Sequence, residues 1–310
     1  MSNRGRAGRN NLAAFLQSAS FAYLILTLTT FFFAANHVLG RGVRAEIPPV
    51  GLSFWRWFLG GVLLLPFVWR GLYASAPVVR AHLLPLSFLG CLMIGGTTLL
   101  LVALNFTTAV NASLINATQP VLTVFLAWLF VREKLKWPQP LGVAAGLAGV
   151  VVMIAKADWQ VIAGMQINGG DIIALVGILG FAVYAINIYK IPRELTPAES
   201  LFVIICSGCT ALTPFYLVET VLYKAVPITA RSLAVILFIA LTVSISAMLM
   251  WNAGNRILGP NRAGMFINLV PVFAAVLAIT CLGEQLFLYH LVGAGLISSG
   301  IYLVLCRHTE

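Results

Sequence analysis

The chain is built from apolar runs of about twenty residues, which short stretches of charged and turn-forming residues separate. A helix needs about 20 mostly apolar residues to cross a bilayer, because each residue rises about 1.5 Å through a hydrocarbon core about 30 Å thick. Charged residues make up only 9% of the 310 positions, whereas water-soluble domains carry about 25%. The sequence therefore predicts an all-α integral membrane protein, with the lipid bilayer as its first partner.

The charges and turn residues divide the chain into ten expected transmembrane helices. Their predicted ranges are 13–40, 50–69, 82–104, 110–131, 139–156, 171–190, 198–222, 232–254, 262–282 and 286–306. Residues 1–12 form an expected N-terminal tail, 157–170 a linker on the outer side, and 307–310 a C-terminal tail. The first run has no charged residue from Asn10 to Gly40, which exceeds the apolar core of a signal peptide, about 7–15 residues. We therefore expect a first spanning helix that is not cleaved.

The basic residues are distributed unequally between the two sides of the membrane. Ten spans place both termini on one side, and Lys and Arg are enriched in cytoplasmic segments. The thirteen basic residues on the side of the termini are Arg4, Arg6, Arg9, Arg70, Arg80, Arg132, Lys134, Lys136, Lys190, Arg193, Arg256, Arg262 and Arg307; the five on the other side are Arg41, Arg44, Lys156, Lys224 and Arg231. This predicts an inner (plasma) membrane protein with both termini cytoplasmic. The basic residues do not cluster into a patch, so no nucleic-acid partner is expected.

The two halves of the chain are similar to each other. At an offset of 148 residues Phe33-Ala34 matches Phe181-Ala182, and Pro66-Phe67 matches Pro214-Phe215. At an offset of 151 residues the matches include Pro120 with Pro271, Glu133 with Glu284, Gly142 with Gly293 and Gly149 with Gly300. Each half has five helices, an odd number, so the second half must enter the membrane in the opposite orientation. The sequence therefore predicts two inverted five-helix repeats, residues 13–156 and 171–306, with a substrate site between them.

Each repeat ends in a Glu-x-Leu sequence followed by Gly, as Glu133-Lys134-Leu135…Gly142 and Glu284-Gln285-Leu286…Gly293. Together with the five-plus-five layout, this pattern resembles the drug/metabolite transporter superfamily, in its ten-helix EamA-type branch, over essentially the whole chain. The resemblance implies a secondary transporter of amino acids, other metabolites or cationic drugs, commonly directed outward. Bacterial amino-acid exporters are the most similar members in length and layout. One departure is Arg132, which stands where the second repeat has Gly283.

Polar side chains inside the spans are costly in lipid, so they usually face a cavity or a partner helix. The candidate substrate-binding residues are Asn36, His37, Arg56, Gln119, Tyr184, Asn187, Trp251, Asn252 and Asn268. Asn36 aligns with Tyr184 in the repeat, so these two side chains would lie at symmetry-related sites. We expect the group to face a central cavity, although any single Asn can equally bridge two helices.

Four of the polar or kinking residues have more specific interpretations. His37 lies in the interior of a span, and an ordinary pKa of about 6.5 would let it couple transport to a proton; a packed neutral histidine is the alternative. Arg56 can attract a substrate carboxylate, pair with Glu46 or extend to the membrane surface. Pro120 and Pro271 occupy equivalent sites, and both remove a backbone hydrogen bond, which predicts hinges beside the cavity.

Motifs for other chemistry are absent from the sequence. It contains no Walker loop, H-E-x-x-H or G-x-S-x-G. Cys206 and Cys209 form C-x-x-C inside a predicted span, without a second metal-binding pair. We therefore expect no catalytic residue, metal or cofactor, and a monomer whose partner is a small-molecule substrate.

Three alternatives stay open at this point. A membrane-embedded enzyme acting on lipid-linked substrates would need an acid–base or metal cluster, which the sequence does not show. An exporter of drugs or cationic compounds is compatible with the resemblance. A channel would not show the saturable counterflow of a transporter.

The orientation is tested with a cysteine at Ser2. We predict that Ser2→Cys in intact cells does not react with a membrane-impermeant maleimide, because the thirteen-to-five excess of basic residues places this terminus in the cytoplasm. Labelling of the added cysteine from outside would contradict the predicted topology.

Overall fold

The computed structural model describes residues 18–43, 46–107, 115–116, 118–132, 137, 139–155, 158, 160, 163–164, 168–282 and 287–305. Its helices are α2 (Ala19–Val43), α3 (Pro49–Ala74), α4 (Ala76–Ala81), α5 (Leu83–Ala103), α7 (Gln119–Leu126), α8 (Gln139–Ile154), α10 (Gly169–Asn187), α11 (Pro197–Leu222), α12 (Ala230–Ile239), α13 (Met248–Leu258), α14 (Pro260–Met265), α15 (Leu269–Leu282) and α16 (Leu288–Leu305). Within these ranges there is no β-strand. Seven helical segments are long and apolar enough to cross a membrane, and three further apolar helices are shorter. The prediction of an all-α, multi-pass membrane protein is confirmed.

Several helices begin at sequence signals that satisfy their first backbone N–H groups. Asn168 and Asp171 form a capping box at the start of α10, and Thr196 and Glu199 form another at the start of α11. A proline lies in the first turn of α3, of α11 and of α14, where a missing N–H costs nothing. In lipid these satisfied helix ends matter, because there is no water to take the place of a missing partner.

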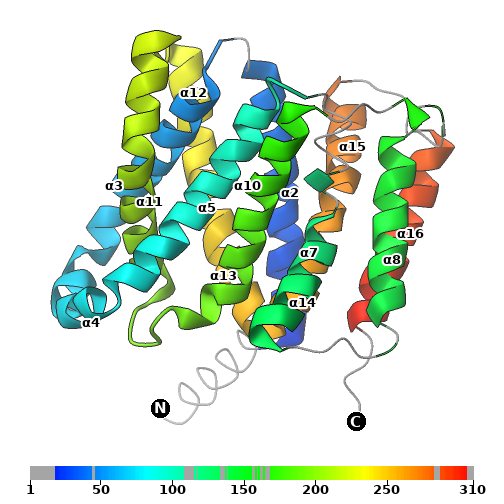
Figure 1. Ribbon diagram of the computed structural model, residues 1–310, viewed down its shortest axis with the longest axis horizontal. Coiled ribbons are helices and arrows are strands. Elements are labelled where there is room, and N and C mark those ends of the chain that lie inside the picture. Colours follow the sequence, from blue (N-terminus) through cyan, green and yellow to red (C-terminus); the bar gives the residue numbers. More distant parts are fainter. Residues whose placement is uncertain are drawn as a thin grey trace, which may run out of the picture.

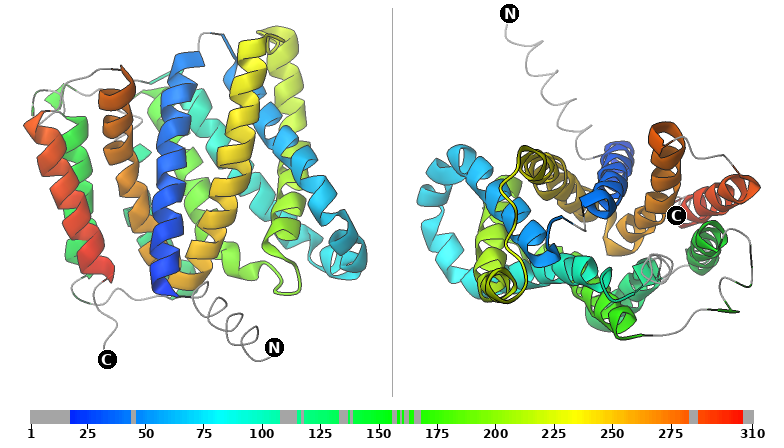
Figure 2. Two further views of the ribbon diagram at one scale, coloured as in Figure 1. Left: turned by 180° about the vertical axis from the view of Figure 1, so that it is seen from behind. Right: turned by 90° about the horizontal axis from the view of Figure 1, so that it is seen from above.

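The helices stand side by side in one bundle (Figure 1). α2 begins and α16 ends at the same face, here called the lower face, whereas α10 begins at the opposite, upper face. Figure 2 shows α8 packed against α16 at one end of the bundle and α3 packed against α11 at the other. Between these ends, α5 and α7 contact α10, and α13 and α15 contact α2.

Glycines allow several of these helices to approach with their backbones almost in contact. A Cβ atom added to Gly142 would lie 2.6 Å from the carbonyl oxygen of Gly300, and one added to Gly149 would lie 2.7 Å from that of Gly293. The chain numbers run in opposite directions along this contact, so α8 and α16 are antiparallel. Small residues at such contacts give van der Waals packing, which is the main attraction between helices in lipid.

A π-helical turn, Ala127–Val131, follows α7 and ends at Arg132. Arg132 is the residue that stands where the second repeat has Gly283, and its φ of 58° is left-handed. This conformation is the usual end of a helix and favours glycine, because a side chain crowds the backbone there. The first repeat therefore places an arginine in a backbone conformation that a glycine adopts more easily.

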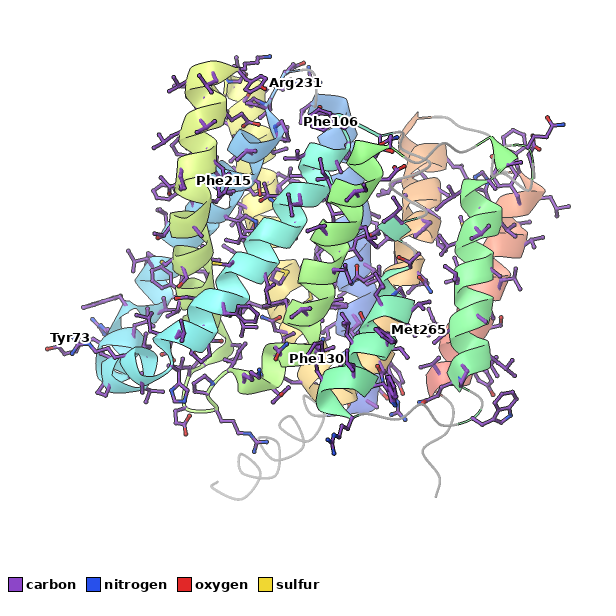
Figure 3. All side chains as sticks on the ribbon, viewed as in Figure 1. Tyr73, Phe106, Phe130, Phe215, Arg231 and Met265 are labelled. Atoms are coloured by element: carbon purple, nitrogen blue, oxygen red, sulfur yellow. The ribbon has the colours of Figure 1, made fainter. Side chains whose placement is uncertain are left out.

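Large apolar side chains cover the outside of the bundle. Tyr73 and Phe215 point away from it (Figure 3) and are 86% and 65% exposed. A water-soluble protein rarely exposes such large apolar area, whereas lipid tails accommodate it. The outer surface is therefore that of a protein embedded in a bilayer.

The close helix contact is tested at two neighbouring glycines of α5. A Cβ at Gly96 would lie 2.7 Å from the carbonyl oxygen of Gly177 on α10, whereas a Cβ at Gly95 would meet nothing within 4 Å. We predict that Gly96→Ala lowers the free energy of unfolding by about 1–3 kcal/mol, because the two backbones must separate. Gly95→Ala, the control, should unfold at the wild-type temperature or above it. Equal thermal unfolding of both variants would contradict the backbone contact.

Candidate functional site

A cavity of about 100 Å³ lies in the middle of the bundle. Residues from α2, α3, α5, α7, α10, α13 and α15 and from the turns between them line it. They are Phe33, Asn36, Arg56, Trp57, Thr97, Leu100, Leu101, Leu104, Asn116, Gln119, Phe181, Val243, Met248, Ile267 and Val270. Segments far apart in the sequence therefore converge on one site.

The cavity lies where the two repeats meet. Four repeat-equivalent pairs have both members in its wall: Phe33 with Phe181 at the offset of 148, and Thr97 with Met248, Asn116 with Ile267 and Gln119 with Val270 at the offset of 151. Both members of each pair line the same cavity, as expected if an axis that relates the two repeats passes through it. Sites on this axis are where inverted-repeat transporters bind their substrates.

The two repeats contribute different chemistry to the cavity wall. Among the described residues the polar lining side chains, Asn36, Arg56, Thr97, Asn116 and Gln119, belong to the first repeat. The described lining residues of the second repeat are apolar: Phe181, Val243, Met248, Ile267 and Val270. Val243 lies in the π-helical segment Ala240–Ala247, an irregularity that often marks functional sites in helices. The first repeat also contributes apolar side chains, so its side of the cavity is mixed, whereas the described part of the second-repeat side is apolar.

Arg56 is the charged residue of the cavity wall. Its side chain is 3% exposed, and its guanidinium lies 5.0 Å from the ring centroid of the neighbouring Trp57. The predicted alternative of a pair with Glu46 is not adopted, because Glu46 accepts a 2.5 Å hydrogen bond from Arg231 at the upper face. Among the described residues Arg231–Glu46 is the single ion pair, so no described carboxylate neutralises Arg56.

A buried cluster lies between the cavity and the lower face. The hydroxyl of Tyr184 donates a 2.7 Å hydrogen bond to Oδ1 of Asn252, and the two residues are 0% and 5% exposed. Trp251 is also 0% exposed, and its ring centroid lies 5.8 Å from that of Phe181 and 6.3 Å from that of Phe33. This cluster, called here the lower closure, lies on the lower-face side of the cavity residues Phe181 and Met248, further along α10 and α13.

The upper face has its own polar contacts between helices. Glu219, near the end of α11, accepts hydrogen bonds of 3.1 and 2.6 Å from the backbone N–H groups of Val50 and Gly51. A carboxylate at a helix N-terminus also interacts favourably with the helix dipole. Thr107 donates a hydrogen bond to Asp171 across the ends of α5 and α10.

The predicted site residues therefore separate into three groups. Asn36, Arg56 and Gln119 line the cavity, whereas Tyr184, Trp251 and Asn252 form the lower closure beside it. Asn187 and Asn268 belong to neither place. The side chain of His37 lies outside the described residues.

Asn187 is hydrogen-bonded within its own helix, and Asn268 packs against another helix. The amide of Asn187 donates a 2.7 Å hydrogen bond to the carbonyl of Val183 in α10. Asn268 is 1% exposed and packs against α8, where a Cβ at Gly146 would lie 2.7 Å from its amide nitrogen. It ends the 3-10 turn Phe266–Asn268, which interrupts the helix just before Pro271.

The two prolines lie at equivalent irregularities. Pro120 is in the first turn of α7, after the turn residue Thr118, and Pro271 is the third residue of α15, after the 3-10 turn. The regular helix is interrupted before each, because proline lacks an N–H and clashes with the preceding turn.

Thr97, Asn116 and Trp57 line the cavity but are missing from the predicted site set. Thr97 and Thr98 interrupt the apolar run of α5, and this interruption is the sequence signal by which Thr97 could have been found. The sequence around Trp57 is typical of an aromatic belt at the membrane interface. In the structure the side chain of Trp57 is instead buried by packing of α3, with 1% of its surface exposed.

Comparison with known proteins shows that one family matches each half of the chain. The EamA-like transporter family matches the chain twice, over residues 20–155 and 168–306. The chain is 24% identical to the uncharacterised transporter YyaM of Bacillus subtilis, covering 90% of this chain and 92% of that protein. It is 26% identical to an uncharacterised transporter of Archaeoglobus fulgidus, covering 94% and 99%.

Two further similarities are informative in different ways. A S-adenosylmethionine uptake transporter of Rickettsia conorii is 29% identical over 125 residues, which is 39% of this chain and 40% of that protein. A solved crystal structure superposes with a TM-score of 0.74 at 18% identity, covering 93% of this chain and 98% of the other. The predicted superfamily, and the prediction of a transporter rather than an enzyme, are confirmed. Because the family matches both halves of the chain, the protein belongs to the EamA-like transporter family.

Proposed function

We propose that this protein is a secondary active transporter that exports amino acids or similar small metabolites by alternating access through the central cavity. It would cross the inner (plasma) membrane ten times as a monomer, with two inverted five-helix repeats and both termini cytoplasmic. The observation that carries the proposal is the set of four repeat-equivalent residue pairs in the wall of one cavity.

The helix contacts support the inverted arrangement of the repeats. Exchanging the halves turns the α5–α10 contact into the α13–α2 contact and the α7–α10 contact into the α15–α2 contact, and all four occur. The same exchange turns the Gly142–Gly300 contact into the Gly293–Gly149 contact. α2 begins at the lower face and α10 at the upper face, as a change of orientation requires.

The different surroundings of repeat-equivalent residues support alternating access. Tyr184 and Asn252 are hydrogen-bonded in the lower closure, while their repeat equivalents, Asn36 and Leu101, line the cavity. If the two repeats exchanged their conformations, Tyr184 would separate from Asn252. Their equivalents Asn36 and Leu101 would then come together on the other side of the cavity. Substrate would then reach the cavity from the cytoplasm.

The remaining parts of the proposal concern hinges, coupling and substrate. The interruptions before Pro120 and Pro271 would act as hinges, and His37 is the candidate for proton coupling. Export of cationic drugs is less compatible with the cavity, because Arg56 places a buried positive charge in its wall. The partial match to S-adenosylmethionine uptake transporters makes S-adenosylmethionine a further compound to test.

The site is tested by alanine substitutions of its polar side chains. In proteoliposomes, Asn36→Ala and Gln119→Ala should each reduce counterflow of the transported amino acid by about three- to tenfold, because each removes one hydrogen bond to substrate. Thr210→Ala on the exposed side of α11 is the control, since its hydroxyl bonds only its own helix at Cys206. Wild-type counterflow in both cavity variants, with normal folding, would contradict the assigned site.

The lower closure is tested at its hydrogen bond. Tyr184→Phe leaves Oδ1 of Asn252 buried without its 2.7 Å donor, so we expect the free energy of unfolding to fall by about 1 kcal/mol. Tyr189→Phe is the matched control, because Tyr189 is 63% exposed. Thermal unfolding of purified protein measures both variants, and an unchanged Tyr184→Phe variant would show that this bond does not hold the closure.

A further inference from the structure

The buried positive charge of Arg56 in the cavity has no described carboxylate partner, although its guanidinium lies over the ring of Trp57. The described acidic residues are Glu46, Asp158, Asp171, Glu194, Glu199 and Glu219. Five of them accept hydrogen bonds from other groups, and Glu194 is exposed. An arginine in a membrane span is costly unless an opposite charge or water compensates it. In this structure the compensating group must therefore come from the solution or from residues outside the described part.

The hydrogen-bonding groups of the cavity wall indicate what that group is. Three lining side chains bury a nitrogen without a partner: Nε of Arg56, Nε1 of Trp57 and Nε2 of Gln119. The Arg and Trp nitrogens are donors in any assignment, because neither side chain has an acceptor. Buried donors without partners are rare and call for an acceptor. A carboxylate has only acceptors, and an arginine binds it with paired hydrogen bonds.

The apolar surface of the cavity indicates the rest of the ligand. Phe181, Met248, Ile267 and Val270 of the second repeat give the cavity apolar surface, to which apolar side chains of the first repeat such as Leu100 and Leu101 add. A ligand that satisfies both kinds of surface carries its negative charge on one end and an apolar body on the other. A cationic or purely polar ligand would leave one of them uncompensated.

We infer that the cavity binds monocarboxylates with an apolar body, and that Arg56 is the residue that binds the carboxylate. The assignment deepens the proposed transport function and rests on it. Two sources share this chemistry, apolar amino acids and the corresponding simple carboxylic acids, and they differ only in the amino group. Arg56 binds the carboxylate in both cases.

The experiment uses the purified full-length protein and two matched sets of compounds. One set is L-leucine, 4-methylpentanoate and L-leucinamide; the other is L-phenylalanine, 3-phenylpropanoate and L-phenylalaninamide. We expect at least one carboxylate to raise the thermal unfolding temperature of the wild type, while the amide of the same set does not. Stabilisation by the amino acid alone identifies the amino acid as the ligand, and equal stabilisation by the simple acid shows that the amino group is not needed.

The variants assign the effect to the residue. Arg56→Met should weaken binding of the carboxylate by about tenfold or more, and Arg56→Lys by less, because a charged group still faces the ligand. Arg70→Met is the control, since Arg70 lies on the same helix and is exposed. Without ligand, Arg56→Met should unfold at the wild-type temperature or above it, because the variant removes an uncompensated buried charge.

Four results would overturn the inference. They are equal stabilisation by the amides, no stabilisation by any of the four carboxylates, unchanged binding in Arg56→Met, and a lower unfolding temperature of ligand-free Arg56→Met. The last would mean that Arg56 is a structural residue. Counterflow in proteoliposomes distinguishes failure of the carboxylate site from failure of the proposed transport function. If the wild type and Arg56→Met carry L-leucinamide equally well, the protein is a transporter but has no carboxylate site.

Discussion

Close contact between helix backbones is the constraint on which this structure depends. Lipid tails are as apolar as leucine, so helices in a bilayer gain little by burying apolar surface against one another. Gly142 and Gly149 on α8 meet Gly300 and Gly293 on α16 at distances that leave no room for a Cβ. This interface is therefore fixed at the level of the backbone.

Fixed helix pairs leave room for a cavity where the pairs meet. The cavity lies between α5, α7 and α10 on one side and α2, α13 and α15 on the other, with α3 beside it. Several polar residues of the membrane interior, Asn36, Arg56 and Gln119 among them, lie in its wall, because facing lipid would leave them unsatisfied. Beside it, Tyr184 and Asn252 are hydrogen-bonded to each other between α10 and α13.

Much of the helix arrangement could be predicted from the sequence, because the length of an apolar run and the charges at its ends are local properties. The range 82–104 was expected to be helical, and α5 covers Leu83–Ala103. Arg56 and Gln119 were expected in the cavity for a general reason, the cost of a polar side chain in lipid, and the structure places both in its wall.

What could not be predicted is which side of the site is closed and which face of a distorted helix is turned inward. Asn36 and Tyr184 are repeat equivalents, yet the first lines the cavity and the second is bonded in the closure. The repeat alignment does not specify that two equivalent residues have different surroundings. The 3-10 turn Phe266–Asn268 changes the helical register, so Ile267 lines the cavity and Asn268 packs against Gly146 instead.

If the lower closure opens during transport, the distance across it must change, and measuring this distance tests alternating access. Spin labels at Tyr189, beyond the end of α10, and at Ile257, near the end of α13, would report this distance after replacement of the five native cysteines. In reconstituted protein the account predicts two distance populations whose proportions change when transported substrate is added. A single distance that stays the same with and without substrate would contradict it.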